Sequence, residues 1–154
     1  MLDLLLPQRI DNTYRGHKLA LWLFGALVLM KGAIGLGTIF NGRGAAISAD
    51  GIPLDTFTPA GQQAFVGVFA AWGLAQFVLN LIGLLVLVRY RAMIPLMFAL
   101  LLLEHVLRRL IFWFLPIART ATAPGFYINL AFVAVMIIGL ILSLRVQNTR
   151  RPHA

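Results

Sequence analysis

The chain has 154 residues, of which 60% are hydrophobic and only 12% are charged, and its formal net charge at pH 7 is +8. A soluble domain of this size has too little interior to bury so much apolar surface, and a disordered chain is more polar. The absence of cysteine excludes a disulfide scaffold, so the composition is that of an integral membrane protein.

Four apolar stretches follow one another along the chain, and each can cross a bilayer, which takes about 20 residues of helix. They cover residues 19–40, 63–88, 93–115 and 126–144. We predict helices rather than a membrane barrel, because the apolar runs are continuous and every backbone polar group must be satisfied inside lipid. The short link between the second and third spans predicts antiparallel neighbours. The expected fold is all-α, a single membrane domain over residues 1–154 built as a bundle of four antiparallel transmembrane helices.

Three segments lie outside the predicted spans. Residues 1–18 are either a short amphipathic segment at the membrane interface or a poorly ordered terminus. We expect the first span to be an uncleaved signal anchor, because no clear cleavage site follows it. The extracytoplasmic loop 41–62 is rich in turn formers and should fold over the end of the bundle, whereas the basic cytoplasmic tail 145–154 should be disordered.

The basic residues predict the orientation of the chain. Eight of the 13 fall in segments on one side of the predicted bundle, two on the other side, and three within spans. By the positive-inside rule both termini are cytoplasmic, in a bacterial inner membrane, with anionic lipid of the cytoplasmic face as a partner. This distribution accounts for the net charge, so no nucleic acid is expected as a partner.

Polar side chains inside the predicted spans are the candidate functional residues, since they are costly to place in lipid. The set is Lys31, Gln76, Asn80, Glu104, His105, Arg108, Arg109 and Asn129. Glu104 and Arg108 are four residues apart and should stack on one helical face. A rise of about 1.5 Å per residue puts Lys31, Gln76 and Glu104 at similar depths, so we predict that they meet near the midplane.

The other members of this set are assigned to the layers beside the midplane. Asn80 should lie one turn closer to the cytoplasm than Gln76, and Arg108, Arg109 and Asn129 should form a second layer nearer the outside. The alternative for each residue is structural: an intrahelical ion pair, a cation that reaches the lipid phosphates, or a hydrogen bond between helices. The charges also make the third span a weak inserter by itself, so it should need partner helices.

Small residues at helical spacing predict packing faces between spans. On the second span the predicted face is Gly67, Ala71 and Ala75. On the first span it is Gly25, Gly32 and Gly35.

Known catalytic and cofactor motifs are absent from the sequence. There is no cysteine pair, no metal-ligand spacing, no phosphate-binding loop, and only one histidine inside a span where a bis-histidine haem needs two. We therefore predict no cofactor, no metal and no assigned catalytic residue. The segments RIDNTYRGHKLALWLF, LVRYRAMIPLMFALLLLEHVLRRL and ADGIPLDTF resemble an uncharacterised family of small four-span inner-membrane proteins of Gram-negative bacteria. That resemblance implies fold and location but no site.

Three functions remain open from the sequence. The first is an accessory membrane protein that binds a lipid or a membrane-protein partner, including a second copy of itself. The second is a small transporter or proton-linked permeation protein that uses the intramembrane charges. The third is a membrane enzyme acting on a lipid or a quinone, with Glu104 or His105 as the acid–base group.

Overall fold

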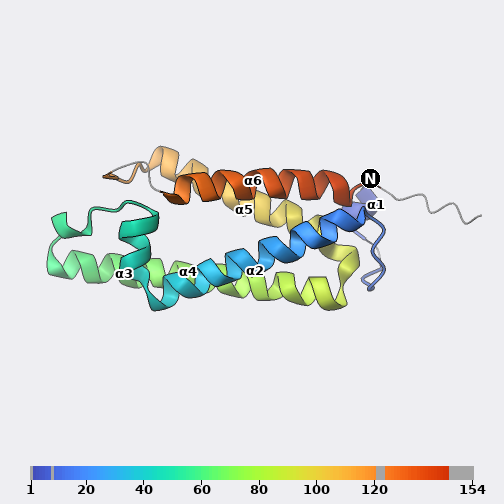
Figure 1. The fold of residues 1–154 in the computed structure, drawn as a ribbon, viewed down its shortest axis with the longest axis horizontal. Helices are drawn as coiled ribbons and strands as arrows, with labels where there is room; N and C mark the ends of the chain where they lie inside the picture. The colour runs from blue at the N-terminus through green and yellow to red at the C-terminus, as the bar shows by residue number, and fades with distance from the viewer. Residues whose placement is uncertain (1, 8, 121–123, 146–154) are drawn as a thin grey trace, which may run out of the picture.

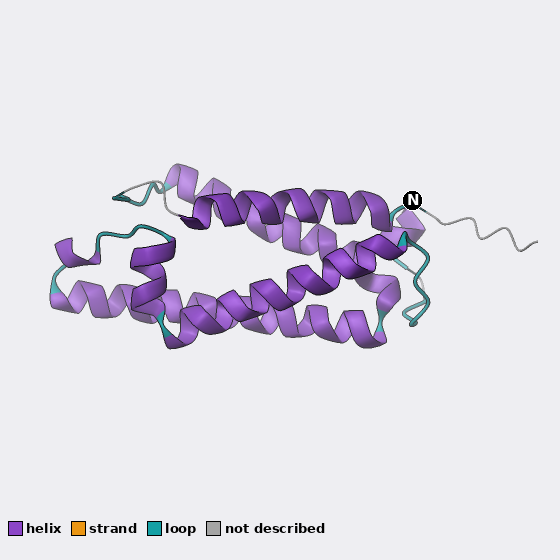
Figure 2. Cartoon of the chain, in the orientation of Figure 1, coloured by secondary structure: helices purple, strands orange, loops and turns teal. Residues whose placement is uncertain are grey.

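A computed structural model describes residues 2–7, 9–120 and 124–145, and these residues form helices and loops without any strand (Figures 1 and 2). Residues 146–154, most of the predicted tail, lie outside the described part. The elements in chain order are α1 (Leu2–Leu5), α2 (Lys18–Phe40), α3 (Gly42–Gly44), the π-helix η1 (Ala45–Ala49), the 3-10 helix η2 (Leu54–Thr56), α4 (Pro59–Arg89), the 3-10 helix η3 (Arg91–Met93), α5 (Ile94–Phe114) and α6 (Pro124–Ser143).

The helix boundaries follow from local capping. Thr58 caps α4 by accepting a hydrogen bond from Gly61 N at 3.1 Å, and Pro59 occupies the first helical position, where its missing N–H costs nothing. Asn41 ends α2 and its side chain accepts from Gly44 N at 3.2 Å, which starts the short turn of α3. With 31 residues, α4 is about 46 Å long and exceeds a hydrocarbon core of about 30 Å.

Three helices, α2, α4 and α6, are long and apolar enough to cross a membrane. Helix α5 has 21 residues, but Glu104, Arg108 and Arg109 in its second half set it apart from the other three. Large apolar side chains such as Trp22, Leu85 and others on all four long helices point outwards, as expected of a surface that meets lipid.

The four long helices extend along the long axis of the molecule (Figure 1). Helix α2 packs along α4, and α6 packs against both α2 and α5. At the end where α2 begins, a hydrophobic core joins these helices, with the rings of Phe24 and Phe98 edge to face at 5.1 Å. At the opposite end, Ala46, Ile52 and Leu54 of the segment between α2 and α4 form a second, smaller cluster that packs against Phe65 and Phe69 of α4.

The segment before α2 is attached to the first end. His17 N donates to Leu142 O at 3.1 Å, and Ala92 N donates to Asp11 O at 3.3 Å. Tyr14 donates from its hydroxyl to His17 O at 3.2 Å, and burial raises the pKa of that hydroxyl to about 12. The start of α2 and the end of α6 therefore lie at the same end of the molecule.

Helix α4 packs through a different face from the one predicted. Gly67, Ala71 and Ala75 are all exposed, and a Cβ added at Gly67 meets nothing within 4 Å. The buried residues of this helix are Gly73, Gln76, Asn80, Gly83 and Val86. The stripe of small residues is a weak guide here because α4 is apolar on every side, so small size alone does not identify the contact face.

The three glycines predicted to form the packing face of α2 do face α4. An ideal Cβ on Gly35 would lie 3.1 Å from Gly73 O, and one on Gly32 would lie 3.8 Å from Asn80 Cβ. Gly25 lies against the side chain of Leu87, 3.4 Å from its built Cβ. The two backbones cross closely at Gly35 and Gly73, about one helical turn from Lys31 and Gln76.

Candidate functional site

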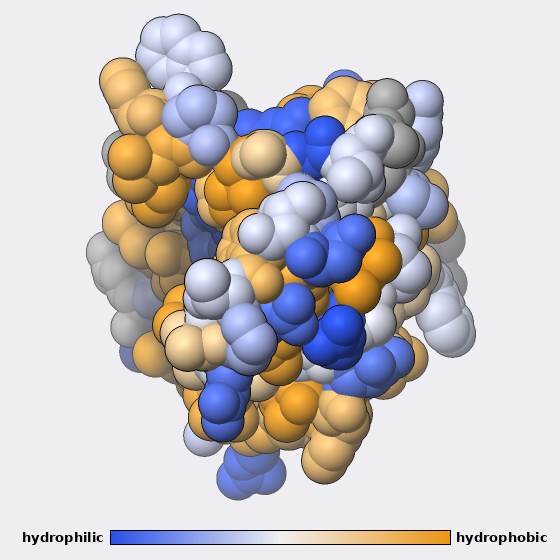
Figure 3. Space-filling model, turned by 90° about the vertical axis from the view of Figure 1, so that its left-hand side faces the viewer, coloured by the Kyte–Doolittle hydropathy of each residue, from blue (hydrophilic) through white to orange (hydrophobic). Residues whose placement is uncertain are grey.

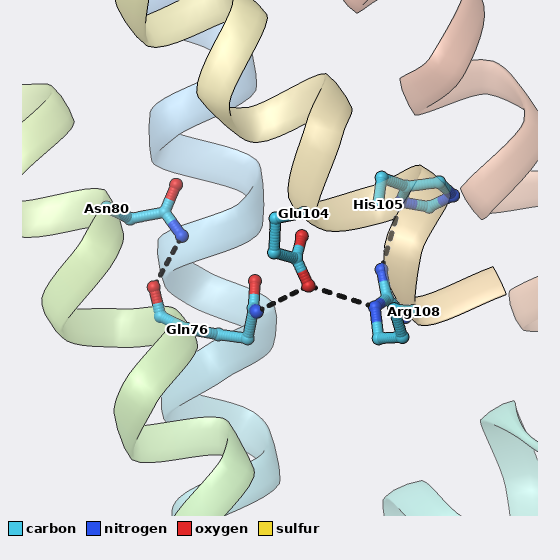
Figure 4. A network of polar contacts seen from close by, with 5 residues as sticks. All are labelled: Gln76, Asn80, Glu104, His105 and Arg108. Carbon is cyan, nitrogen blue, oxygen red and sulfur yellow. Dashed lines mark hydrogen bonds and ion pairs between the residues drawn. The ribbon is translucent and has the colours of Figure 1, made fainter. Parts of the chain in front are cut away.

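A polar network joins α4 to α5 between the two hydrophobic clusters (Figure 4). One carboxylate oxygen, Glu104 Oε1, accepts from Gln76 Nε2 at 2.9 Å and from Arg108 Nε at 3.0 Å. The other, Glu104 Oε2, is buried and has no hydrogen-bond partner among the described residues. The predicted stacking of Glu104 and Arg108 is therefore present, and Gln76 reaches the same carboxylate from the neighbouring helix.

The guanidinium of Arg108 is held on three sides. Besides Glu104, its Nη2 lies 2.9 Å from Nδ1 of the buried His105, and its Cζ lies 5.2 Å from the centroid of the Trp72 ring. A guanidinium carries only donors, so Nδ1 must accept the hydrogen bond and the ring proton of a neutral His105 resides on Nε2. These contacts fix the orientation of Arg108.

Asn80 forms its hydrogen bond within its own helix. Its Nδ2 donates to Gln76 O at 2.7 Å, and its Oδ1 is buried without a partner in the described part of the chain. The alternative reading of Asn80 as a hydrogen bond between helices is thus not what the structure shows.

Lys31 lines a cavity beside this network, near enough for the charges of Glu104 and Arg108 to act on it, but among the described residues it forms no hydrogen bond or ion pair with them. Its side chain is only 6% exposed, and Nζ lies 5.5 Å from the centroid of the Phe132 ring on α6. Within residues 2–7, 9–120 and 124–145 the ion pair found is Arg108 with Glu104, so the expected meeting of Lys31 with Glu104 is not an ion pair. The physical reason is local. Arg108 lies one turn from Glu104 on the same helix, so the two side chains are held on one face and form the ion pair with each other.

A partly open cavity of about 320 Å³ lies beside Lys31 and is lined by residues of all four long helices and η1. Its polar lining residues are Lys31, Thr38, Asn41, Ser48, Asp50, Gln76, Arg108 and Asn129. A second cavity of about 340 Å³ adjoins it, since Asp50, Phe69, Trp72, Arg108 and Asn129 line both. The second cavity has mainly apolar walls, which include Phe65, Phe112 and Ile117.

The structure brings the three residues of the predicted second layer to one cavity. Arg108, Arg109 and Asn129 all line the second cavity. Arg109 and Arg119 are exposed at its edge, and the Cζ of Arg109 lies 5.0 Å from the centroid of the Phe126 ring. Figure 3 shows this end of the molecule, where hydrophilic and hydrophobic residues are interspersed.

The loop after α2 closes this end of the cavities, where it was expected to fold. Thr120 N donates to Gly51 O at 2.9 Å, and Gly51 adopts a positive φ of 67° that suits glycine. An ideal Cβ on Gly125 would lie 2.6 Å from Ala49 O and 3.1 Å from Asp50 Oδ1, so only glycine permits this approach of α6 to the loop.

Asp50, in the loop after α2, places a carboxyl group in the lining of both cavities. Burial raises the pKa of Asp50, whereas the nearby Arg119 and Arg108 act in the opposite direction. Sequence reasoning did not select Asp50 or Trp72. Asp50 lies in a turn-forming Asp-Gly pair of the loop. Trp72 precedes Gln76 by four residues, so it lies on the same face of the helix as Gln76, and this spacing is the sequence signal that identifies Trp72.

The described residues hold no group of three His, Asp or Glu side chains that would bind a metal ion. Comparison of the chain with protein-family models, with curated proteins and with solved structures found no match. The family resemblance seen in the sequence therefore stays a prediction, and the geometry of the cavities is the basis for a functional assignment.

Proposed function

We propose that the chain is a four-span protein of the bacterial inner membrane, in which α2, α4, α5 and α6 form an antiparallel bundle with both termini in the cytoplasm. The apolar length of α2, α4 and α6 supports three of the spans. For α5, support comes from its contacts with α4. Glu104 accepts a hydrogen bond from Gln76, and Arg108 packs on the ring of Trp72. These contacts shield Glu104 and Arg108 from lipid, which lowers the cost of inserting α5 together with its partner helices, whereas Arg109 stays exposed.

Within that membrane fold we propose that the protein binds a lipid-like amphiphile and acts as an accessory protein rather than as a catalyst. The observation that carries this function is the pair of adjoining cavities. One has buried cationic and amide groups, and the other has aromatic and aliphatic walls. Each falls within the range of about 300–1,000 Å³ typical of ligand pockets. A polar compartment joined to an apolar one matches a molecule with a head and a tail.

The test is retention of lipid by the purified protein. Asn129 lines both cavities, so Asn129→Phe should fill the space between them. Ile137→Phe is the matched control, because Ile137 lies eight residues further along the same helix and is 42% exposed. Native mass spectrometry of protein in mild detergent should detect bound lipid on the wild type and Ile137→Phe, and much less on Asn129→Phe.

Two results would contradict lipid binding in these cavities. One is a wild-type protein that carries no lipid after purification. The other is an Asn129→Phe variant that elutes as a folded protein and keeps as much lipid as Ile137→Phe. Stoichiometric co-purification of another protein without lipid would instead favour the partner-binding form of the accessory role.

A transporter is the second candidate, favoured by the buried position of Lys31 in the middle of α2. A buried cation without an ion-pair partner in the described part of the chain is common along substrate pathways. In sealed liposomes a transporter gives flux that Lys31→Gln abolishes, whereas a binding protein gives none.

A further inference from the structure

We infer that the amphiphile carries an anionic group, a phosphate or a carboxylate, and that this group binds between Lys31 and Arg108. The inference rests on the proposed lipid binding and specifies the chemistry of the head. It places the anion at the inner end of the 320 Å³ cavity and the tail in the adjoining 340 Å³ cavity.

The first support is the environment of Lys31. Its side chain is 94% buried and lines the cavity, yet the structure gives it no hydrogen bond or ion pair with a described residue. Nζ lies over the face of the Phe132 ring, and a cation–π contact is a weak substitute for water. Glu104 is near enough for its charge to act on Lys31, but it forms its ion pair with Arg108. A buried ammonium without an ion pair or hydrogen bond of its own is costly, so an anion in the cavity would stabilise the folded protein at this point.

The second support is the partial use of Arg108. Of the five N–H donors of a guanidinium, one is engaged by Glu104 and one by His105, which leaves three for a ligand. The contacts with Glu104, His105 and Trp72 restrain the guanidinium, which reduces the side-chain entropy that Arg108 loses when an anion binds. Lys31 and Arg108 come from α2 and α5 and line the same cavity, so an anion there is bound by both helices.

The two carboxylates near the cavity determine where the anion lies. Glu104 is not among the cavity-lining residues, and its Oε1 is occupied by Gln76 and Arg108. Asp50 lines the cavity at the end closed by the loop, where it lies near the exposed Arg119. The carboxylate of Asp50 repels an anion, whereas Lys31 and Arg108 attract it. The anionic head therefore lies at the Lys31 end of the cavity, and the tail lies along the aromatic walls of the adjoining cavity.

The experiment measures binding of defined amphiphiles to the full-length protein in detergent by native mass spectrometry and by the shift in melting temperature. The probes are phosphatidylglycerol, phosphatidylcholine, oleate and inorganic phosphate. We expect phosphatidylglycerol or oleate to bind at least about tenfold more tightly than phosphatidylcholine, a difference of about 1.4 kcal/mol. The comparison of phosphatidylglycerol with oleate distinguishes a phosphate head from a carboxylate head.

Variants locate the anion. Lys31→Gln should weaken binding of the preferred anionic amphiphile by about tenfold to a hundredfold, the range expected for a hydrogen bond to a charged group. Lys31→Arg should retain most of it. Lys18→Gln is the matched control, because it makes the same substitution at an exposed position on the same helix, and its affinity should stay within about twofold of the wild type.

Each contrary outcome has its own meaning. Equal binding of phosphatidylcholine and both anionic amphiphiles, or full binding by Lys31→Gln, overturns the anionic head and leaves lipid binding intact. Inorganic phosphate that binds as tightly as phosphatidylglycerol overturns the need for a tail. Failure of every amphiphile to bind the wild type overturns the proposed function itself. The comparison of the probes uses the wild-type protein and so does not depend on the folding of any variant.

Discussion

The crossing of α2 and α4 gives a quantitative prediction at Gly73. An ideal Cβ at this position would lie 2.8 Å from Thr38 Cβ, 2.9 Å from Thr38 Cγ2 and 3.1 Å from Gly35 O. Ordinary van der Waals contact begins at 3.4 Å, so Gly73→Ala must separate the helices locally by about 0.6 Å. Overpacking of this kind costs about 1–3 kcal/mol. The higher helix propensity of alanine offsets up to about 1 kcal/mol of this cost.

Gly67→Ala on the same helix is the matched control. Its added Cβ meets nothing within 4 Å, so only the gain in helix propensity, up to about 1 kcal/mol, remains. The difference between the two variants is the overpacking cost alone, about 1–3 kcal/mol in the free energy of unfolding, with Gly73→Ala the less stable. That difference corresponds to about 2–12 °C in melting temperature for a chain of this size.

The assay is unfolding of each variant in mixed micelles, by heat and by titration with a denaturing detergent, followed by far-ultraviolet circular dichroism. A Gly73→Ala protein as stable as Gly67→Ala, or more stable, would refute the close crossing and with it the position of Lys31 relative to Gln76. The substitution leaves every polar group in place, so the result reports packing alone.

Two further predictions concern the charged groups. Because burial raises the pKa of Asp50 above 3.8, its contribution to stability is complete below that pH and is lost as the pH rises through the folded-state pKa. Asp50→Asn should thus gain melting temperature over the wild type at neutral pH and lose this advantage below about pH 4. A double-alanine cycle should couple Gln76 to Glu104 by about 0.6–1.7 kcal/mol, and Asn80 to Glu104 by about 0 kcal/mol.

The same measurements define the results that would contradict these two predictions. If the melting-temperature difference between Asp50→Asn and the wild type is the same at every pH, the raised pKa of Asp50 does not contribute to the pH dependence of stability. Coupling of Asn80 to Glu104 as large as that of Gln76 would contradict the hydrogen bond of Asn80 to its own helix.

Local chemistry made part of the fold predictable from the sequence. Hydrophobic length locates α2, α4 and α6. Helix α4 begins at Pro59, four residues before the apolar stretch 63–88, because Thr58 caps it there. The ion pair of Glu104 and Arg108 is predictable for the same reason, since four residues along one helix always lie on one face.

The rotation of each helix about its axis was decided only by the tertiary structure. In a helix that is apolar all round, the pattern of residues does not mark an inner face, and lipid is as apolar as the protein interior. Gly73 and Gly83 face α2 while Gly67, Ala71 and Ala75 face outwards, and this choice follows from the fit of side chains between helices. The rotation of α2 likewise decides that Lys31 lines the cavity and forms no ion pair with a described residue.

The composition of 60% hydrophobic residues determined by itself that this is a membrane protein, because apolar surface on that scale is stable only in lipid. The place of the few buried charges required the assembled helices. Depth along a helix predicts which residues lie at one level, but direction around the helix decides which of them touch. For that reason Gln76 forms a hydrogen bond with Glu104, whereas Lys31, which lines the same cavity as Gln76, forms no ion pair among the described residues.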